Sequence, residues 1–434
     1  MLVVDAVPSS AQRLTWLGTL GGDQSLAWGV SADGSVVVGV ADNASGQGHA
    51  FRWTLSGGMH DLGTLGGDES RASGVSADGS VVVGWASNAS GYRRAFRWTL
   101  SGGMQDLGTL GGDESYAYGV SADGSVVVGR ASNASGPDHD RAFRWTAQTG
   151  MQDLGALDGV QSVALGVSAD GSVVVGYALN ASERWRAFRW TASGGMQDLG
   201  TLGGDESYAY GVSADGSVVV GMARNTSGQW RAFRWTVSGG MQDLGTLPGS
   251  DWSVASGVSA DGSVVVGWAS NASGQWRAFR WTVSGGMEDL NNAYDTLLTD
   301  GSVLYAAYAV SPDGRYIVGQ GFNAAAGRRE AFLLEVQTTG VEETFGPRAV
   351  LLAQNVPNPF ATSTTIRFVL PRWSHVKLTV VDVLGREVAT LVDGELRAGE
   401  HTVVFSAGDL PSGVYFYRVQ AGAVVQLRKM EVVR

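Results

Sequence analysis

An eleven-residue phrase, GVSADGSVVVG, recurs almost unchanged along most of this chain. The seven copies, of which the last is the divergent AVSPDGRYIVG, begin at Gly29, Gly74, Gly119, Gly166, Gly211, Gly257 and Ala309. Successive copies are 45, 45, 47, 45, 46 and 52 residues apart. A repeat of this length holds about four short strands, which is the size of one β-propeller blade. The period therefore predicts an all-β architecture built from blades.

Each repeat has the pattern of four strands joined by tight turns. In the first repeat we expect strands over 25–31, 36–40, 50–54 and 59–65. Glycines in the intervening turns supply the positive φ that short hairpins need. The valine run has the continuous apolar pattern of a strand that is buried on both faces.

The hairpin between the third and fourth strands gives a testable register. If Thr54 pairs with Met59, then Arg52 faces Asp61 on the neighbouring strand. The same nine-residue spacing between Arg and Asp recurs in six repeats. We interpret these pairs as cross-strand ion pairs that serve the architecture rather than as a catalytic or anion site.

The strand count predicts how the array closes. The fourth-strand phrase follows six AFRWT strands, and one further copy stands alone at 14–20, before the first repeat. The last repeat ends with a third strand at 331–336 and has no fourth strand. We expect the N-terminal strand to supply it, closing a seven-bladed β-propeller of four-stranded blades and removing its exposed strand edges. A β-helix would need shorter coils, and an open solenoid would need capping repeats.

The wording of the repeat resembles a known family. HAFRW at 49–53 and DLGTLGG at 61–67, together with GVSADGSVVVG, are similar to the HAF repeats of bacterial extracellular proteins, over roughly residues 14–336. Only the first copy carries the histidine, His49, and the later copies mostly have arginine there. The resemblance implies an extracellular setting and a propeller-like repeat. It brings no catalytic residue with it.

Composition excludes several classes of function. Residues 1–346 carry 20 Arg and no Lys against 34 acidic residues, a balance of −14, whereas residues 347–434 have a balance of +3. The acidic repeat region argues against nucleic acid as a partner, because phosphate binding needs a basic face. No segment approaches the ~20 apolar residues of a membrane-spanning helix. The chain has no cysteine, so neither disulfides nor thiolate metal sites are possible.

The repeat ends near residue 336, and a different module follows. We expect an N-terminal extension at 1–13, the propeller at 14–336, a polar linker at 337–349 and a C-terminal domain at 350–434. Alternating apolar residues at about ten-residue spacing, with turns around Gly385 and Gly394, predict a small Ig-like β-sandwich for the last domain.

The C-terminal domain resembles the type A sorting domain of the type IX secretion system, which is found in Bacteroidetes-like bacteria. Four motifs in the matching order carry the resemblance, and their residues include Asn355, Pro357, Asn358, Pro359, Phe360, Gly385, Gly413, Tyr415, Tyr417 and Lys429. The resemblance implies handling by that secretion machinery and an extracellular or outer-surface location. Such cargo also needs a signal peptide, and the first ten residues lack its basic and apolar segments. We expect this leader to be missing from the sequence as given.

The loops at one end of the blades are where the repeats differ, and we place a candidate ligand-binding face there. Its residues are aromatic or acidic: Tyr92, Trp185, Trp230, Trp276, Trp252, Asp68, Asp113 and Asp205. Aromatic rings among carboxylates suit a sugar, which stacks on rings and donates hydroxyl hydrogen bonds. Two interpretations stay open for the tryptophans, packing on a neighbouring blade or ligand contact. The acidic residues equally suit turn capping and solubility. Tyr116, Tyr118, Tyr208 and Tyr210 are placed to line the channel mouth.

Nothing in the sequence points to catalysis, a cofactor or a metal. The five histidines have no metal-ligand spacing, and neither a nucleophile elbow nor a phosphate loop is present. We therefore expect a secreted, monomeric, non-enzymatic binding or adhesion module whose ligand is polysaccharide or another surface polymer. The alternatives are a carbohydrate-active lyase or hydrolase on a propeller scaffold, and a platform for protein–protein interaction.

Overall fold

The structure is a computed structural model. It describes residues 12–336 and 351–433, the latter range without 371–373, 384, 397–398, 409 and 422–423. The chain separates into two compact units, Met1–Thr338 and Thr339–Arg434. Regular structure in both is almost wholly β, which confirms the all-β prediction. The expected extension at 1–13 and linker at 337–349 fall almost entirely outside the described residues.

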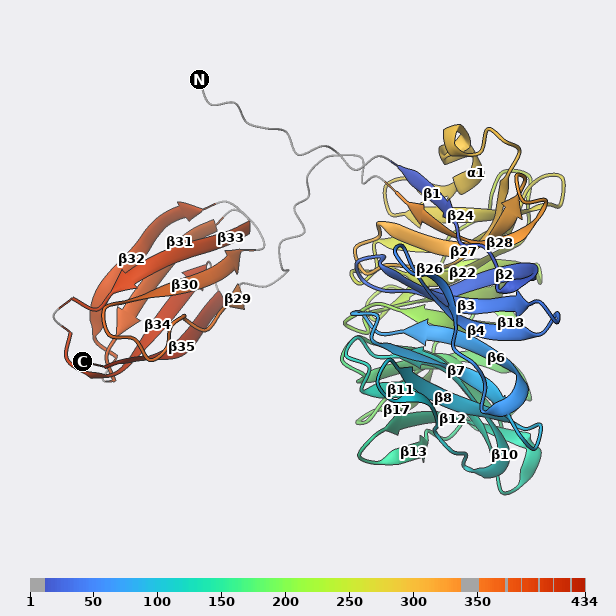
Figure 1. The fold of residues 1–434 in the computed structure, drawn as a ribbon, viewed down its shortest axis with the longest axis horizontal. Helices are drawn as coiled ribbons and strands as arrows, with labels where there is room; N and C mark the ends of the chain where they lie inside the picture. Colours follow the sequence, from blue (N-terminus) through green and yellow to red (C-terminus); the bar gives the residue numbers. More distant parts are fainter. Residues whose placement is uncertain are drawn as a thin grey trace. The chain divides into compact units, whose positions relative to one another are not determined.

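The first unit is a series of sheets in which each repeat contributes consecutive antiparallel strands (Figure 1). The first strands are β2 (Gly21–Val30), β6 (Gly66–Val75), β10 (Gly111–Val120), β14 (Ser162–Val167), β18 (Gly203–Val212), β22 (Ser253–Val258) and β26 (Val303–Val310). The second strands carry the valine run and are β3 (Val36–Asn43), β7 (Val81–Asn88), β11 (Val126–Asn133), β15 (Val173–Leu179), β19 (Val218–Asn225), β23 (Val264–Ser270) and β27 (Tyr316–Asn323). As predicted, the valines are buried throughout.

The outer part of each sheet comes from the AFRWT phrase and the strand after it. The third strands are β4 (Gly48–Thr54), β8 (Arg93–Thr99), β12 (Gly136–Thr146), β16 (Trp185–Thr191), β20 (Trp230–Thr236), β24 (Trp276–Thr282) and β28 (Arg328–Glu335). The fourth strands are β5 (Gly58–Asp61), β9 (Gly103–Asp106), β13 (Gly150–Asp153), β17 (Gly195–Asp198), β21 (Gly240–Asp243) and β25 (Gly286–Asp289). The result is a set of four-stranded sheets of the propeller type.

The N-terminal strand lies on the last repeat. β1 (Arg13–Trp16) pairs antiparallel with β28, with Thr15 opposite Leu333 and Trp16 opposite Phe332. The first and last sheets also join through one parallel bridge between Gln24 and Arg329. In Figure 1 the blue strands of the first repeat therefore lie beside the orange strands of the last one.

A buried serine at the start of each of the first six repeats connects neighbouring sheets. Ser115, fully buried, accepts a hydrogen bond from the backbone N–H of Ala95 in the preceding repeat at 2.9 Å. Its hydroxyl donates to the carbonyl of Gly108 at 2.6 Å. The same arrangement holds at Ser25, which accepts from Ala331 of the last repeat at 2.8 Å. A side chain that satisfies two backbone groups is well suited to fix one sheet against the next.

Backbone hydrogen bonds also run from turn to turn between the repeats. In each repeat the alanine N–H of the Ala-Asp-Gly turn donates to the carbonyl of the residue at the same position in the next repeat, at 2.9–3.0 Å. The residues in this series are Ala32, Ala77, Ala122, Ala169, Ala214, Ala260 and Pro312. Pro312 has no N–H, so it accepts from Ala260 and has nothing to donate onward.

The predicted register of the outer hairpin was wrong by one residue. Thr54 pairs with Gly58 and Trp53 with Met59, so Asp61 lies opposite Phe51 rather than Arg52. Gly58, with φ +67°, extends the pairing one residue into the turn. As a result Asp61 instead contacts His49, with 2.7 Å between Oδ2 and Nδ1. At the equivalent place Arg94, Arg186 and Arg277 lie 3.2–4.0 Å from the strand-four aspartates.

The expected Arg–Asp pairs are therefore replaced by contacts between sheets. Arg97 Nε donates to the carbonyl of Gly124 in the next repeat at 3.3 Å. The same bond to the next Asp-Gly turn is made by Arg52, Arg144, Arg189 and Arg234. The fourth strands are also shorter than predicted, because Asp61 Oδ1 accepts from Gly63 N–H and turns the chain after residue 61.

The longest interval between repeats holds a helical turn that the sequence pattern did not predict. It consists of α1 (Leu290–Ala293) and a 3-10 turn (Asp295–Leu297). Asp289 caps α1 by accepting from Asn291 N–H at 2.8 Å. The buried Leu290 and Tyr294 extend the hydrophobic core beside the last sheet.

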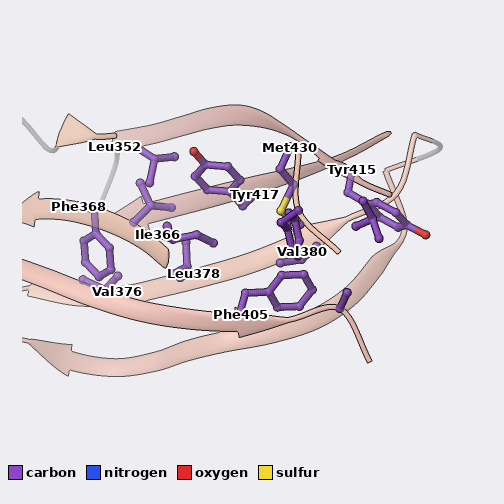
Figure 2. Close-up of a cluster of buried hydrophobic side chains, with 14 of the residues drawn as sticks. Leu352, Ile366, Phe368, Val376, Leu378, Val380, Phe405, Tyr415, Tyr417 and Met430 are labelled. Carbon is purple, nitrogen blue, oxygen red and sulfur yellow. The ribbon is translucent and has the colours of Figure 1, made fainter. Parts of the chain in front are cut away.

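The second unit consists of two sheets around one core. One sheet holds β29 (Leu351–Leu352), β30 (Ser363–Leu370) and β33 (Gly399–Ser406). The other holds β32 (Glu387–Leu396), β31 (Ser374–Val381), β34 (Gly413–Ala421) and β35 (Val424–Val432). Figure 2 shows side chains of both sheets meeting between them, among them Ile366, Phe405, Leu378 and Tyr417.

The residues that carry the sorting-domain resemblance mostly hold this unit together. Tyr417, fully buried, accepts from the N–H of Asn355 at 2.8 Å and donates to the carbonyl of Ala353 at 2.7 Å. Phe360 is buried and bridges to the end of β35. Pro357 and Pro359 follow cis peptide bonds, and Asn358 between them accepts from Glu431 N–H. Gly385 has φ +78°, and Gly413 begins β34. Tyr415 is buried, and the Lys429 ammonium lies 4.0 Å from the Glu431 carboxylate.

Candidate binding face

The first strands of the seven repeats share a central cavity of about 300 Å³. Each contributes the residue before the repeated phrase and the first two residues of the phrase. The first of these three positions is the variable one, occupied by Trp28, Ser73, Tyr118, Leu165, Tyr210, Ser256 and Tyr308. The channel wall is therefore nearly uniform except for this one layer.

The variable layer also lines a second cavity of about 300 Å³, which we call the mouth. Arg71 and Trp268 complete its lining. A side cavity of about 410 Å³ shares Arg71 and Tyr118 with the mouth. On the other flank, a cavity of about 490 Å³ shares Trp268 and Tyr308 with it. The three cavities are thus adjacent, with shared walls, and we call them together the groove.

Aromatic rings follow one another along the groove. Trp276 contacts Trp252 with ring centroids 4.5 Å apart, and Trp252 contacts Trp268 at 6.1 Å. From Trp268 the series continues through Tyr308 at 5.5 Å to Trp28 at 4.3 Å. These separations lie within the 4.5–7 Å range, or just below it, in which aromatic pairs attract.

A second aromatic series lies on the fourth and fifth repeats. Trp185 packs edge-on against Tyr177, with centroids 5.1 Å apart, and Tyr177 contacts Tyr208 of the next repeat at 4.9 Å. Tyr208 in turn contacts Trp230 at 5.5 Å. Burial raises the pKa of the Tyr208 phenol to about 12, and burial is also the main cause of the raised pKa of Tyr177. These phenols are therefore neutral hydrogen-bond donors at physiological pH.

The predicted tryptophans lie in these series, but only Trp276 lines one of the three cavities, and it is 47% exposed. Trp252 reaches the groove through its contact with Trp276. Trp185 and Trp230 pack first on tyrosines close to them in their own repeats, rather than on the neighbouring blade that the packing alternative named. Tyr92 is exposed and lines none of the three cavities.

The predicted aspartates are exposed and lie outside the three cavities. Asp205 is within 3.4 Å of Arg184, an ion pair that suits a solvated surface. Asp113 contributes its backbone carbonyl to Arg94. The structure does not bring Asp68, Asp113 and Asp205 together with the groove.

The sequence interpretation missed Trp28, Trp268, Tyr308 and Arg71, which line the mouth, and Trp85, which lines the side cavity. Tyr118 and Tyr210, which were placed at the channel mouth, do line it. A signal for Trp28 and Tyr308 was present, because the residue before each repeated phrase varies, and Trp85 and Trp268 directly follow a copy of the phrase at another variable position. Among the described residues, no cluster of three or more histidine, aspartate or glutamate side chains is arranged to hold a metal ion.

Comparisons with known proteins identify the second unit. Residues 356–433 match the family model described as the secretion system C-terminal sorting domain. This tail, of the type IX system, indicates export to the cell surface or the extracellular space. Within the part of the chain that is described, no helix is long and apolar enough to cross a membrane.

Solved structures that resemble the chain share little sequence with it. The WD40 β-propeller domain of Doa1 is 14% identical, with 75% of this chain and 98% of that one covered and a TM-score of 0.45. TolB from Acinetobacter baumannii is 10% identical, with 67% and 76% covered and a TM-score of 0.40. PorZ, a surface component of the type IX system of Porphyromonas gingivalis, is 12% identical, with 94% and 51% covered and a TM-score of 0.31. A search of curated protein sequences found no significant match.

Proposed function

We propose that the first unit is a closed seven-bladed β-propeller of HAF-like repeats, spanning 14–336. We also propose that the sorting domain at 350–434 directs the export of this propeller to the cell exterior, where the protein is a monomer. The pairing of β1 with β28 and the bond from Ala331 to Ser25 support closure. The central cavity, lined equivalently by all seven repeats, supports it independently. The first unit is then a rigid platform for whatever the exported protein contacts.

We further propose that this platform binds polysaccharide without processing it. The observation that carries the proposal is the groove, whose three adjacent cavities share lining residues and are followed by aromatic rings. An extended trough suits a chain of sugar units better than a single small molecule. Ring faces offer C–H stacking, and Gln275 and Gln320 offer amide groups for hydroxyls at one end.

The experiment is a polysaccharide binding screen on the full chain, with soluble products assayed in the same samples. Trp252→Ala combined with Trp276→Ala should weaken binding at least about tenfold, since aromatic side chains that a bound ligand covers contribute more than ~1 kcal/mol each. Leu100→Ala is the matched control, because Leu100 is an apolar side chain, 89% exposed, that lines none of the three cavities. Equal binding by the double variant contradicts the groove assignment. Product release would favour the lyase or hydrolase alternative, and binding only to a secreted protein would favour the interaction platform.

The outlying residues Tyr92, Trp185, Trp230, Asp68, Asp113 and Asp205 stay part of the proposal as secondary contacts around the groove. Trp230→Ala is the informative variant among them. Arg224 lies over the Trp230 ring at 4.6 Å, so this ring is already stacked on one face. We expect Trp230→Ala to weaken binding less than the Trp252/Trp276 double variant does.

A further inference from the structure

Arg71 is the one charged residue at its position in the repeat. Three residues before each repeated phrase, the other copies have Leu26, Tyr116, Val163, Tyr208, Val254 and Ala306. These counterparts are aliphatic or aromatic, so the arginine does not come from the repeat pattern. It also lies in a region whose net charge is strongly negative. A single cation placed there points to a role that the other six copies do not share.

The Arg71 guanidinium is held by rings rather than by a carboxylate. It lies 5.7 Å from the ring centroid of Trp28 and 5.8 Å from that of Trp85. Both distances are within the range of cation–π attraction. Glu69, the nearby carboxylate, is 3.4 Å from Arg93. Within the described residues the Arg71 guanidinium has neither an ion pair nor a hydrogen bond, so its N–H donors remain available to a ligand.

Its place in the groove puts these donors in the path of a ligand. Arg71 lines both the mouth and the 410 Å³ side cavity, where the two join. At the far end of the groove Arg329 lies 5.6 Å from the Tyr305 ring and likewise has no carboxylate partner among the described residues. It occupies the place that Trp185, Trp230 and Trp276 hold in other repeats. A polymer lying along the groove would therefore meet Arg71 on one side of the mouth and Arg329 on the other.

We infer that the groove selects anionic polysaccharides, with Arg71 and Arg329 binding acidic groups on separate sugar units. The planar guanidinium has the donor geometry for bidentate contact with a carboxylate or a sulfate. The aromatic rings between the two arginines contact the sugar rings. This inference rests on the proposed polysaccharide function and names the class of polysaccharide.

The test measures binding of the full chain to charged and neutral forms of one backbone. The probes are polygalacturonate and its fully methyl-esterified form for carboxylate, and dextran sulfate and dextran for sulfate. We expect the charged member of at least one pair to bind at least tenfold more tightly, and its affinity to fall as salt rises. Arg71→Gln should lose roughly ten- to hundredfold of that affinity, which is what charge-assisted hydrogen bonds are worth.

Arg186→Gln is the matched control, since Arg186 is paired with Asp198 at 3.2 Å and lies outside the groove. It removes the same charge and should change affinity less than about twofold. Equal binding of charged and neutral probes would overturn the inference while the proposed function stands. Binding of charged probes that Arg71→Gln leaves intact would also overturn it. Failure of all four probes to bind, with no hit in the wider screen, would overturn the polysaccharide function itself.

Discussion

The buried serine between sheets offers the sharpest test of how the first unit is held together. In Ser115→Ala, the N–H of Ala95 loses its acceptor and the carbonyl of Gly108 loses its donor. Ala95 and Ser115 are fully buried, so water cannot replace the bond to the N–H. The side-chain volume changes only slightly. The effect is therefore that of unpaired polar groups and not of a cavity.

The magnitude follows from counting these groups. A buried backbone donor without a partner costs about 1–3 kcal/mol. The Gly108 carbonyl is half-buried and recovers part of its loss from solvent. We therefore expect Ser115→Ala to lower the free energy of unfolding by about 2–4 kcal/mol. Ser125→Ala is the control, because Ser125 is exposed and its bond to Asp123 is replaceable by water, so a change within ~0.5 kcal/mol is expected.

Urea unfolding followed by tryptophan fluorescence is the appropriate assay, since all but one of the 15 tryptophans precede residue 338. Ser25→Ala extends the test to closure, because its acceptor role joins the last repeat to the first. In a closed ring it should cost as much as Ser115→Ala. If Ser115→Ala matches the Ser125→Ala control, the reasoning about buried serines fails. If only Ser25→Ala matches it, the ring is open at this interface.

Three further predictions concern other parts of the chain. Gly129→Ala should lower the free energy of unfolding by more than ~3 kcal/mol in the same urea assay, because the new Cβ would lie 1.9 Å from a carbonyl oxygen. A soluble variant of normal stability would contradict this. Hydrogen bonds, first from serine side chains and then from backbone N–H groups, lower the pKa of Asp78 and Asp123 to about 2, below the unfolded value of 3.8. The contribution of these carboxylates to stability is thus complete above about pH 4 and is lost as pH falls toward 2. Between pH 5 and pH 2, the urea midpoint of the Asp78→Asn, Asp123→Asn double variant should therefore drop less than that of the unmodified protein. In the second unit, Tyr417→Phe should cost about 1–3 kcal/mol, measured by hydrogen exchange on β34, and unchanged exchange would exclude the role of its hydroxyl.

The period and turn residues were sufficient to predict the sheets, but not every register. Each copy of the phrase ends its first strand at Asp-Gly, and the structure has the expected turn there. The outer hairpin was misaligned because pattern alone does not say whether Gly58 belongs to the turn or to the strand. A shift of one residue moves each side chain to the other face, which is why Arg52 was assigned the wrong partner.

The candidate site was harder to predict because the residues at its centre meet across repeats. Tyr308 contacts both Trp28 and Trp268, which are 280 and 40 residues away along the chain. No spacing rule within one repeat brings such residues together. Loop composition drew attention to the acidic outer turns instead, whose predicted aspartates lie outside the groove.

The distribution of constant and variable positions follows from what each position contacts. The Asp-Gly turns and the glycine within each valine strand make contacts within or between sheets, so every copy needs them, and the buried serines do the same in the first six copies. The layer that includes Trp28 and Tyr118 faces the shared cavity, where one copy can change without breaking a bond between sheets. An array of near-identical repeats thus has one inner surface on which differences between copies carry little structural cost. Arg71, two residues before Ser73 of this layer, is a further difference between copies and lines the mouth, and this is the physical reason to look for the ligand there.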